Sequence, residues 1–306
     1  MTFQDRMQAG YQTTGPAMIL GTAMLDNQAV ANTPITIPLK SLNRHGLIAG
    51  ATGTGKTKTV QLFAELLSDN GVPVLLMDLK GDLSGLAASG TPNDKITERH
   101  EKIGIPFEPH ALPVEFLTIS DEPGVRLRAT VFDFGSILLS QILDLNSTQQ
   151  SVLAVVFKYC QDNRIPLITL DDMQTALKHI MGPGEAEFDA SYGHVSTASI
   201  GSIQRKIIEL QQQGADKFFG EPTFNIYDLV RTDNNGKGII SILRLTDLQN
   251  RPKLFSTFML NLLTQAYNTL PEVGDMDKPK FVIVIDEAHL IFDNATKELL
   301  NKIESI

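Results

Sequence analysis

The feature that most constrains the fold of this chain is an eight-residue run rich in glycine and threonine. Residues 50–57 read Gly-Ala-Thr-Gly-Thr-Gly-Lys-Thr and match the pattern G-x-x-x-x-G-K-[ST] without a mismatch. Between a strand and a helix, such a loop turns its backbone N–H groups around a phosphate, and the helix N-terminus adds positive charge. The sequence therefore predicts a phosphate-binding loop, with a short apolar strand over 46–50 before it and an amphipathic helix after it.

The residue types in this loop suit the binding of ATP with Mg²⁺. Lys56 would reach the β- and γ-phosphates, and the hydroxyl of Thr57 would ligate the Mg²⁺ ion. The glycines allow the backbone to approach the phosphates closely, which a larger side chain would prevent. The candidate cofactor-binding residues are therefore Gly50, Ala51, Thr52, Gly53, Thr54, Gly55, Lys56, Thr57 and Lys58.

A second motif lies near the end of the chain. Residues 281–285 read Phe-Val-Ile-Val-Ile, a pattern typical of a buried strand, and they lead directly into Asp286 and Glu287. Ligands of open α/β sheets bind at the carboxyl ends of the strands. We expect Asp286 to hold Mg²⁺ through water and Glu287 to polarise the attacking water, so that Glu287 and Lys56 are the catalytic residues. Together the two motifs predict ATP hydrolysis.

Other nucleotide-dependent classes fit the sequence less well. A GTPase would carry N-K-x-D at a strand end, but the nearest run, 301–304, reads Asn-Lys-Ile-Glu and lies in a helical pattern. Residues 286–289 spell Asp-Glu-Ala-His, as in a class of two-lobed helicases, yet Lys56 and Asp286 lie 230 residues apart (286 − 56), too far for one such lobe. A small-molecule kinase is disfavoured because Glu287 beside Asp286 suits the activation of water.

Composition limits the partners and the compartment. The net charge of −9 argues against a surface that binds nucleic acid throughout, but it allows a local basic loop. The one cysteine, Cys160, excludes an internal disulfide, and we expect a buried thiol there. The first twenty residues have no signal-peptide pattern, and no apolar run reaches the roughly 18 residues of a membrane helix. We therefore expect a cytoplasmic protein without a membrane partner.

The apolar periodicity predicts an α/β fold, a mainly parallel sheet flanked by helices. Strands are expected over 46–50, 72–78, 115–120, 125–132, 238–245 and 281–285, with a hairpin turn at 121–124. Helices are expected directly after the loop and over 147–161, 169–181, 196–213 and 252–270. The chain would comprise a short β-rich segment (1–40), turning at Asp26-Asn27, and an ATPase domain (41–306) with a helical insertion at about 140–232; residues 89–113 would run over the surface.

Longer runs resemble one family. Residues 43–57 and the run Asp78-Leu79-Lys80-Gly81-Asp82 resemble the HerA–FtsK superfamily of ring-forming, DNA-pumping ATPases, in particular its bacterial HerA-like helicase/ATPase family. Supporting runs are 217–222, 270–275 and 278–280, and the resemblance extends from about Gly15 to the end. It implies a P-loop NTPase fold of the RecA/ASCE type and ATP hydrolysis. It also implies a hexameric ring of identical chains that acts on duplex DNA or with a DNA-processing enzyme.

The sequence departs from this family in one respect. The resemblance implies a further strand after the Asp-Glu motif, carrying a polar sensor near the γ-phosphate. The sequence ends 20 residues after Asp286 (306 − 286), within a helical pattern marked by Leu299, Leu300, Ile303 and Ile306. We expect a chain truncated after this motif, a natural protein that is incomplete, or another segment in the place of this strand. In its given form, the ATPase activity of the chain is in question.

Several other residues have two interpretations. Asp78, Lys80 and Asp82 close the second strand, and they either lie near the active site or solvate a strand end. Ring ATPases often complete a neighbour's site with an arginine. Spacing does not choose among Arg126, Arg128, Arg205, Arg244 and Arg251. We expect the pair Phe218-Phe219 to belong to the core.

Two functions of different classes stay open. The first is a DNA-translocating motor driven by ATP hydrolysis. The second is a nucleotide-switched scaffold that binds another protein and hydrolyses ATP slowly or not at all, which the acidic balance favours. Salt dependence of DNA binding separates them, because only a protein that grips phosphates weakens steeply with salt.

Overall fold

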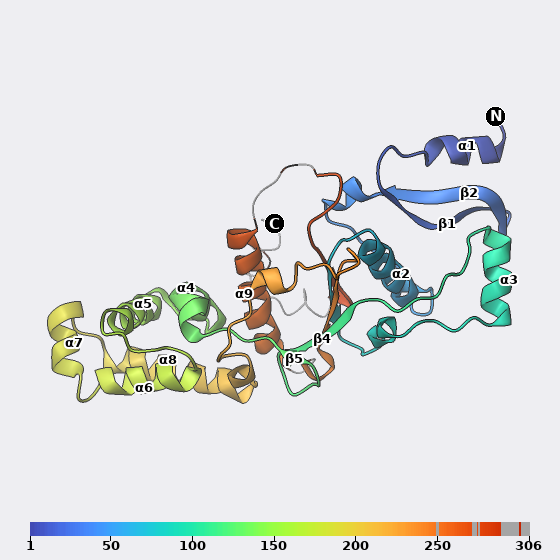
Figure 1. Ribbon diagram of the computed structural model, residues 1–306. Coiled ribbons are helices and arrows are strands. Elements are labelled where there is room, and N and C mark those ends of the chain that lie inside the picture. Colours follow the sequence, from blue (N-terminus) through green and yellow to red (C-terminus); the bar gives the residue numbers. More distant parts are fainter. Residues whose placement is uncertain (249–250, 271–273, 275, 289–299, 301–306) are drawn as a thin grey trace. The chain divides into compact units, whose positions relative to one another are not determined.

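The computed structural model describes residues 1–248, 251–270, 274, 276–288 and 300 (Figure 1). The chain divides into two compact units. The first unit comprises Met1–Phe116, Tyr227–Leu243 and Glu272–Asp286, and the second comprises Leu117–Ile226, Arg244–Pro271 and Glu287–Ile306. The glycine-rich loop belongs to the first unit, whereas most of the described helices belong to the second.

A long antiparallel hairpin lies near the start of the first unit. Strands β1 (Ala17–Leu25) and β2 (Gln28–Pro38) pair from Ala17↔Pro38 to Leu25↔Gln28. Asp26 and Asn27 join them with φ angles of 50° and 60°, the left-handed conformation that a two-residue hairpin turn of type I′ requires. The turn expected at these two residues is confirmed. Helix α1 (Phe3–Gly10), which precedes the hairpin, was not expected from the sequence.

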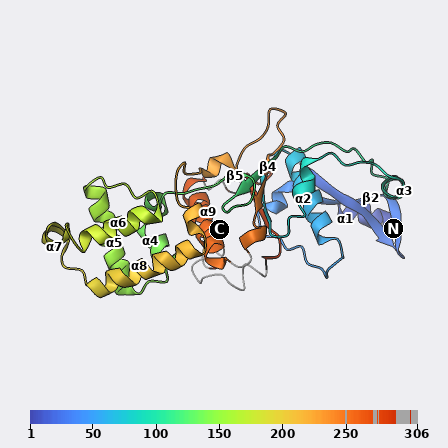
Figure 2. The same cartoon turned by 90° about the horizontal axis from the view of Figure 1, so that it is seen from below.

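Over the described residues, the central sheet has five strands in the order β5-β4-β6-β3-β7. Strands β3 (Val74–Asp78) and β7 (Val282–Ile285) run parallel, in register from Val74↔Val282 to Met77↔Ile285. The other strands are β4 (Val114–Thr118), β5 (Val125–Arg126) and β6 (Ile240–Arg244). All residues of β3 are buried, as expected inside a parallel sheet. The α/β class with a mainly parallel sheet and flanking helices is confirmed (Figures 1 and 2).

The strand expected over 46–50 does not form in the structure. Residues 45–50 have no regular secondary structure, and Leu47 is 87% exposed. A strand needs a neighbour to receive its backbone hydrogen bonds. Within the described part of the chain, β7 is the last strand of the sheet and only β3 lies beside it. The apolar run from Leu47 to Ala49 therefore has the composition of a strand, but no described strand lies beside it to pair with.

The prediction of a hairpin around residues 121–124 is wrong. Strands β4 and β5 pair in parallel, through Leu117↔Val125 and Thr118↔Arg126, so the connection brings the chain back to run in the same direction. The second expected strand also ends early, because Val131 begins helix α4. Thr130 caps that helix by accepting a hydrogen bond from the backbone N–H of Asp133, a local signal that outweighs the apolar alternation.

The second unit is largely helical. Its helices are α4 (Val131–Ile142), α5 (Ser147–Asp162), α6 (Leu170–Ile180), α7 (Glu185–Tyr192), α8 (Thr197–Gln212) and α9 (Pro252–Thr269). The helices expected over 147–161, 169–181, 196–213 and 252–270 are confirmed, whereas α4 and α7 were not expected. Asn146, Thr169 and Ser196 cap three of them with side-chain oxygens. No helix in the described residues is long and apolar enough to span a membrane.

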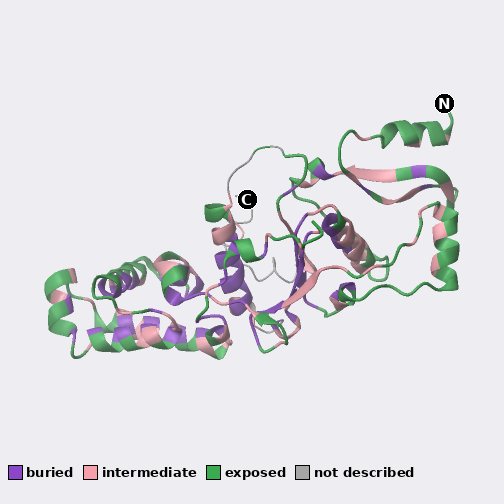
Figure 3. Ribbon diagram, in the orientation of Figure 1, coloured by how far each residue is buried: buried purple, intermediate pink, exposed green. Residues whose placement is uncertain are grey.

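Burial follows the expected division between core and surface. The thiol of Cys160 is buried, which raises its pKa to about 11, and Phe218 and Phe219 are core residues that contact Phe134 edge-on. Each of these expectations is confirmed. Helix α3 (Asp94–Ile103) lies within the stretch expected at the surface and buries none of its residues, as Figure 3 shows in green.

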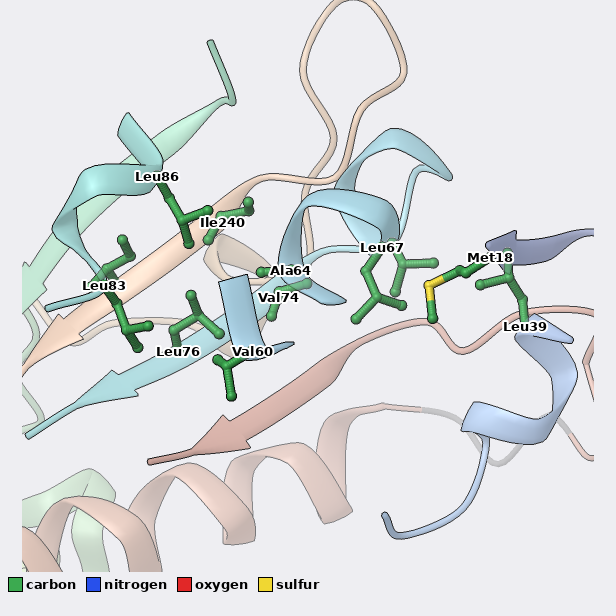
Figure 4. Packing of buried hydrophobic residues seen from close by; sticks show 12 residues of the cluster. Met18, Leu39, Val60, Ala64, Leu67, Val74, Leu76, Leu83, Leu86 and Ile240 are labelled. Carbon is green, nitrogen blue, oxygen red and sulfur yellow. The ribbon is translucent and has the colours of Figure 1, made fainter. Parts of the chain in front are cut away.

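The core of the first unit joins helix α2 (Lys56–Asp69) to the sheet. Val60, Ala64 and Leu67 on one face of α2 belong to the same buried cluster as Val74 and Leu76 of β3 (Figure 4). The cluster also includes Met18, Leu39, Val72, Leu83, Leu86, Ile240 and Ile242. Burying one large apolar side chain contributes about 1.5–3 kcal/mol, so this contact firmly fixes the helix against its strand.

The C-terminal end of α2 approaches another backbone segment very closely. Gly238 donates its N–H to the carbonyl of Ser68 at 2.8 Å, and the Ser68 hydroxyl donates to the carbonyl of Gly238 at 2.6 Å. A Cβ atom on Gly238 would lie 2.1 Å from the carbonyl oxygen of Val72. Only glycine therefore fits at this position.

Replacing Gly238 with alanine should lower the free energy of unfolding by about 3 kcal/mol, because the added methyl group meets backbone atoms that cannot move aside cheaply. Urea denaturation followed by circular dichroism measures the loss. Gly85→Ala is the matched control, since a Cβ there meets no atom within 4 Å. Equal losses in both variants would show that the close approach at Gly238 is not a constraint.

Candidate nucleotide-binding site

The glycine-rich loop has a conformation that depends on its glycines. Gly53 and Gly55 have φ angles of 80° and 96°, in the left-handed region that other residues rarely adopt. Thr54 turns back on the loop, its N–H and hydroxyl both donating to the carbonyl of Ala51, at 3.3 and 2.7 Å. A Cβ on Gly50 would lie 2.5 Å from the Thr54 hydroxyl oxygen. The three glycines are thus needed to form this turn.

Helix α2 begins at Lys56 without a side-chain cap. Its N-cap residue, Gly55, has no side chain to accept a hydrogen bond from the first turn, and no acidic residue lies in that turn. The first N–H groups of a helix have no partner within the helix, and the helix dipole places partial positive charge at this end. An anion is the natural ligand for such a helix start. The loop and the start of α2 therefore provide a cradle suited to a phosphate group.

The ammonium group of Lys56 lies against the same loop. Its Nζ atom donates to the carbonyl oxygens of Gly50 at 2.7 Å and of Ala51 at 3.1 Å. Both acceptors are neutral, whereas a phosphate oxygen carries negative charge and adds the attraction of two opposite charges. Residues 50–55 are exposed to solvent, and the neighbouring Thr57 is partly exposed. A charged phosphate that reaches the loop would thus compete well for the lysine.

The second motif lies at the carboxyl end of β7. The N–H of Asp286 donates to the carbonyl of Met77 at 3.3 Å, which continues the parallel ladder with β3 by one more residue. Glu287 follows with a φ angle of 48°. A residue other than glycine seldom adopts this left-handed conformation, and such residues concentrate at functional sites. The strand therefore ends in a sharp turn at the two expected acidic residues.

Asp78, at the end of the adjacent strand β3, has a structural role. Its side chain is buried, and its two carboxylate oxygens accept hydrogen bonds from the backbone N–H groups of Gly81 at 2.6 Å and Leu83 at 3.2 Å. The loop after β3 is also held to α2, because the side-chain amide of Gln61 donates to the carbonyl of Asp82 at 3.1 Å. Because Asp78 is buried, it does not solvate the strand end as one of its two interpretations had it; it holds the turn that follows β3. Neither Asp78's turn nor Gln61 had a recognisable signal in the sequence.

Contacts connect the expected site residues through the first unit. The glycine-rich loop continues into α2, α2 packs on β3, and β3 pairs with β7, which Asp286 directly follows. The boundary between the two units falls between Asp286 and Glu287. The five candidate arginines all lie in the second unit, where Arg128 donates to the carbonyl of Glu221 and Arg244 pairs with Glu122 at 3.4 Å. Two open cavities, of about 440 Å³ around Cys160 and about 300 Å³ around His100, include no residue of the loop.

The chain has the same fold as several proteins of known structure. Among solved structures, the chain is similar to VirB4 of Thermoanaerobacter pseudethanolicus, with 17% sequence identity and a TM-score of 0.51, over 96% of this chain and 74% of that one. It is also similar to the bacterial conjugative coupling protein TrwBdeltaN70 in complex with sulphate, with 14% identity and a TM-score of 0.55 over 100% and 76%. The plasmid coupling protein TrwB in complex with ADP and Mg²⁺ matches with 13% identity and a TM-score of 0.54 over 98% and 74%.

At these identities the solved structures establish the fold, which is the P-loop NTPase fold of VirB4 and TrwB. No curated protein sequence matches the chain. The family model described as helicase HerA-like C-terminal matches residues 23–306, which is almost the whole chain. The resemblance to HerA-like ATPases inferred from the sequence is therefore confirmed, and the chain belongs to the helicase HerA-like C-terminal family.

Proposed function

We propose that this protein binds ATP with Mg²⁺ and hydrolyses it to drive movement along DNA. The observation that carries the proposal is the uncapped start of α2, behind a loop whose glycines leave room for phosphate oxygens and whose lysine lies among neutral carbonyls. Family membership supports an ATPase. The structure of TrwB in complex with ADP and Mg²⁺ supports the choice of nucleotide and ion.

The residues of the cradle divide the work of binding. The backbone N–H groups of residues 50–57 would surround the phosphates, Lys56 would neutralise the terminal ones, and Lys58 would lie at the edge of the site. Thr57 and Asp286 would hold Mg²⁺, which supplies charge neutralisation when it is bound. A hydroxyl and a carboxylate are the hard oxygen donors that this ion prefers, so the residues present fit it.

Hydrolysis would depend on Glu287. A carboxylate beside the bound nucleotide can orient a water molecule for in-line attack on the γ-phosphate and accept its proton. The left-handed backbone at Glu287 is the kind of strain found where a side chain must be aimed in one direction. Glu287 therefore serves as the general base, and Lys56 stabilises the charge on the transferred group.

The motor would work as a hexameric ring of identical chains in the cytoplasm of a bacterium. Family membership supports this assembly, with duplex DNA or a DNA-processing enzyme as partner. We propose residues 1–40 as a short β-rich segment and residues 41–306 as the ATPase domain, with a helical insertion at about 140–232. The bacterial conjugative and plasmid coupling proteins that share this fold suit a partner that carries or processes DNA.

A nucleotide-switched scaffold is the second candidate function. The observation that favours it is charge: 35 acidic residues against 26 lysines and arginines give the chain a net charge of −9. An acidic surface repels DNA phosphates and suits a basic protein partner. In this case nucleotide binding would persist, and hydrolysis would be slow.

Replacing Lys56 with alanine should weaken the binding of Mg·ATP by about 10- to 100-fold, because the charged hydrogen bonds to the phosphates are lost. Isothermal titration calorimetry with a slowly hydrolysed ATP analogue measures the change. Lys95→Ala, an exposed lysine on α3, is the matched control and should bind as the wild type does. Equal affinity in wild type and Lys56→Ala would refute the proposed phosphate contact.

Replacing Glu287 with glutamine should lower the rate of ATP hydrolysis by about 100-fold or more while nucleotide binding persists, because the amide cannot accept the proton of the attacking water. Steady-state phosphate release measures the rate. The control is Glu101→Gln on the exposed face of α3, which should leave turnover unchanged. Unchanged turnover in both Glu287→Gln and Lys56→Ala would remove the mechanism.

Duplex DNA should bind in a strongly salt-dependent manner and should stimulate ATP hydrolysis. A motor that contacts six or more phosphates loses roughly 10³-fold in affinity between 50 and 200 mM salt. Fluorescence anisotropy over this salt range distinguishes the candidates. Salt-independent or undetectable DNA binding, together with intact nucleotide binding, would favour the scaffold.

A further inference from the structure

A short segment before β7 contacts both flanks of the phosphate loop and its helix. We call residues 276–278 the connector. The side-chain amide of Asn43, seven residues before Gly50, donates to the carbonyl of Met276 at 2.7 Å. The ammonium group of Lys278 donates to the carbonyls of Asn70 at 2.8 Å and Gly71 at 3.3 Å, which follow the last residue of α2. The connector thus joins the start and the end of the segment that forms the nucleotide cradle.

The contact of Lys278 has a clear electrostatic basis. The last carbonyls of a helix have no partner within the helix and carry partial negative charge, so a cation placed there is stabilised. Gly71 has a φ angle of 67°, and a Cβ on it would lie 3.1 Å from the Lys278 nitrogen. The same Cβ would lie even closer, at 2.7 Å, to the carbonyl oxygen of Gly236, so the left-handed glycine after α2 leaves space for this backbone as well as for the lysine.

Two other side chains meet the same end of α2, but through a different group. Lys237 and His110 pair with the carboxylate of Asp69, at 2.6 and 3.2 Å. They come from the loop before β6 and the loop after α3, and neither adjoins β7. Among these three, only Lys278 joins the end of α2 to the strand that leads to Asp286.

The two elements that the connector joins, α2 and β7, lead to the proposed Mg²⁺ ligands. Helix α2 begins with Lys56 and Thr57, and its 14 residues form a rod of about 21 Å. Four residues after Lys278 the chain enters β7, which lies parallel to β3 and leads into Asp286. A shift of the connector would slide β7 relative to α2 and so move Asp286 relative to Thr57.

We infer that Lys278 and Asn43 are positioning residues that set the placement of Asp286 relative to Thr57, and thereby the strength of Mg²⁺-dependent nucleotide binding. Neither residue touches the cradle itself. The inference rests on the proposed binding of Mg·ATP. It adds to that proposal a second link between the loop and the carboxylate, made through the connector in addition to the packing of α2 on β3 and the pairing of β3 with β7.

The first measurement is the affinity of a fluorescent ATP analogue with Mg²⁺ and with EDTA. Lys278→Met keeps the length of the side chain and removes the ammonium group, and it should reduce the gain in affinity from Mg²⁺ by about tenfold. Lys278→Arg should restore most of the gain, since a guanidinium can also donate to both carbonyls. Lys280→Met, two residues further on and exposed, should equal wild type. Equal losses with Mg²⁺ and with EDTA would indicate a merely structural role and overturn the inference.

The second measurement needs no nucleotide. Hydrogen–deuterium exchange in the unliganded protein should rise in residues 43–57 and 282–286 of Lys278→Met, and not in Lys280→Met, because the connector no longer holds the two segments. Unchanged exchange in both segments would overturn the inference on its own. A wild type that binds no nucleotide would instead refute the proposed function, and the exchange result would still decide the role of the connector.

Discussion

The packing of helix α2 on strand β3 is the contact on which the rest of the first unit depends. Val60, Ala64 and Leu67 bury themselves against Val74 and Leu76, and this apolar contact fixes the helix start beside the carboxyl edge of the sheet. The glycine-rich loop is exposed and makes no such contact of its own. Its position therefore follows from that of the helix, which in turn follows from side chains that never meet a phosphate.

The two ends of this helix are treated in opposite ways. Just after its C-terminal end, Lys278 donates to the carbonyls of Asn70 and Gly71, and Lys237 and His110 pair with Asp69. Gly71 closes the turn. At its N-terminal end Gly55 offers no cap. Stabilising groups thus gather where the helix has only a structural task. The end that has to accept a ligand keeps its hydrogen-bonding capacity, although a serine or aspartate there would give a more stable helix.

Local signals in the sequence were sufficient for much of this architecture. Some signals depend only on residues close together in the chain, and the elements that they predict are found. These signals are the glycines and Lys56 of the loop, the helix caps Asn146 and Thr169, and the apolar run of β7. The wrong strand predictions concern pairing. Residues 46–50 have the composition of a strand, and residues 121–124 that of a hairpin turn, but a strand exists only if a partner lies beside it. Composition does not report that partner.

The same limit applies to the candidate site. The motif residues could be named from the sequence because their spacing is fixed by the chemistry of phosphate binding. The contacts that hold these motif residues in place could not be predicted from the sequence. These contacts join segments that are distant in the sequence or lie in irregular loops. They are the hydrogen bonds from Gly81 and Leu83 to Asp78, from Gln61 to Asp82, and from Lys278 to the residues after α2. Such contacts follow from the folded geometry and have no motif of their own.

The uncapped start of α2 also links folding to the solution around the protein. A ligand that binds the native state and not the unfolded chain stabilises the native state by RT ln(1 + [L]/Kd). If α2 binds the nucleotide as we propose, inorganic oxyanions would use the same backbone N–H groups, and phosphate or sulphate in a buffer would act as a weak stabilising ligand. The free energy of unfolding measured in a phosphate buffer would then include the binding of the anion, whereas the value measured in an amine buffer would not. Because α2 begins after Gly55 rather than after a capping side chain, an anion bound there would contribute to the free energy of unfolding.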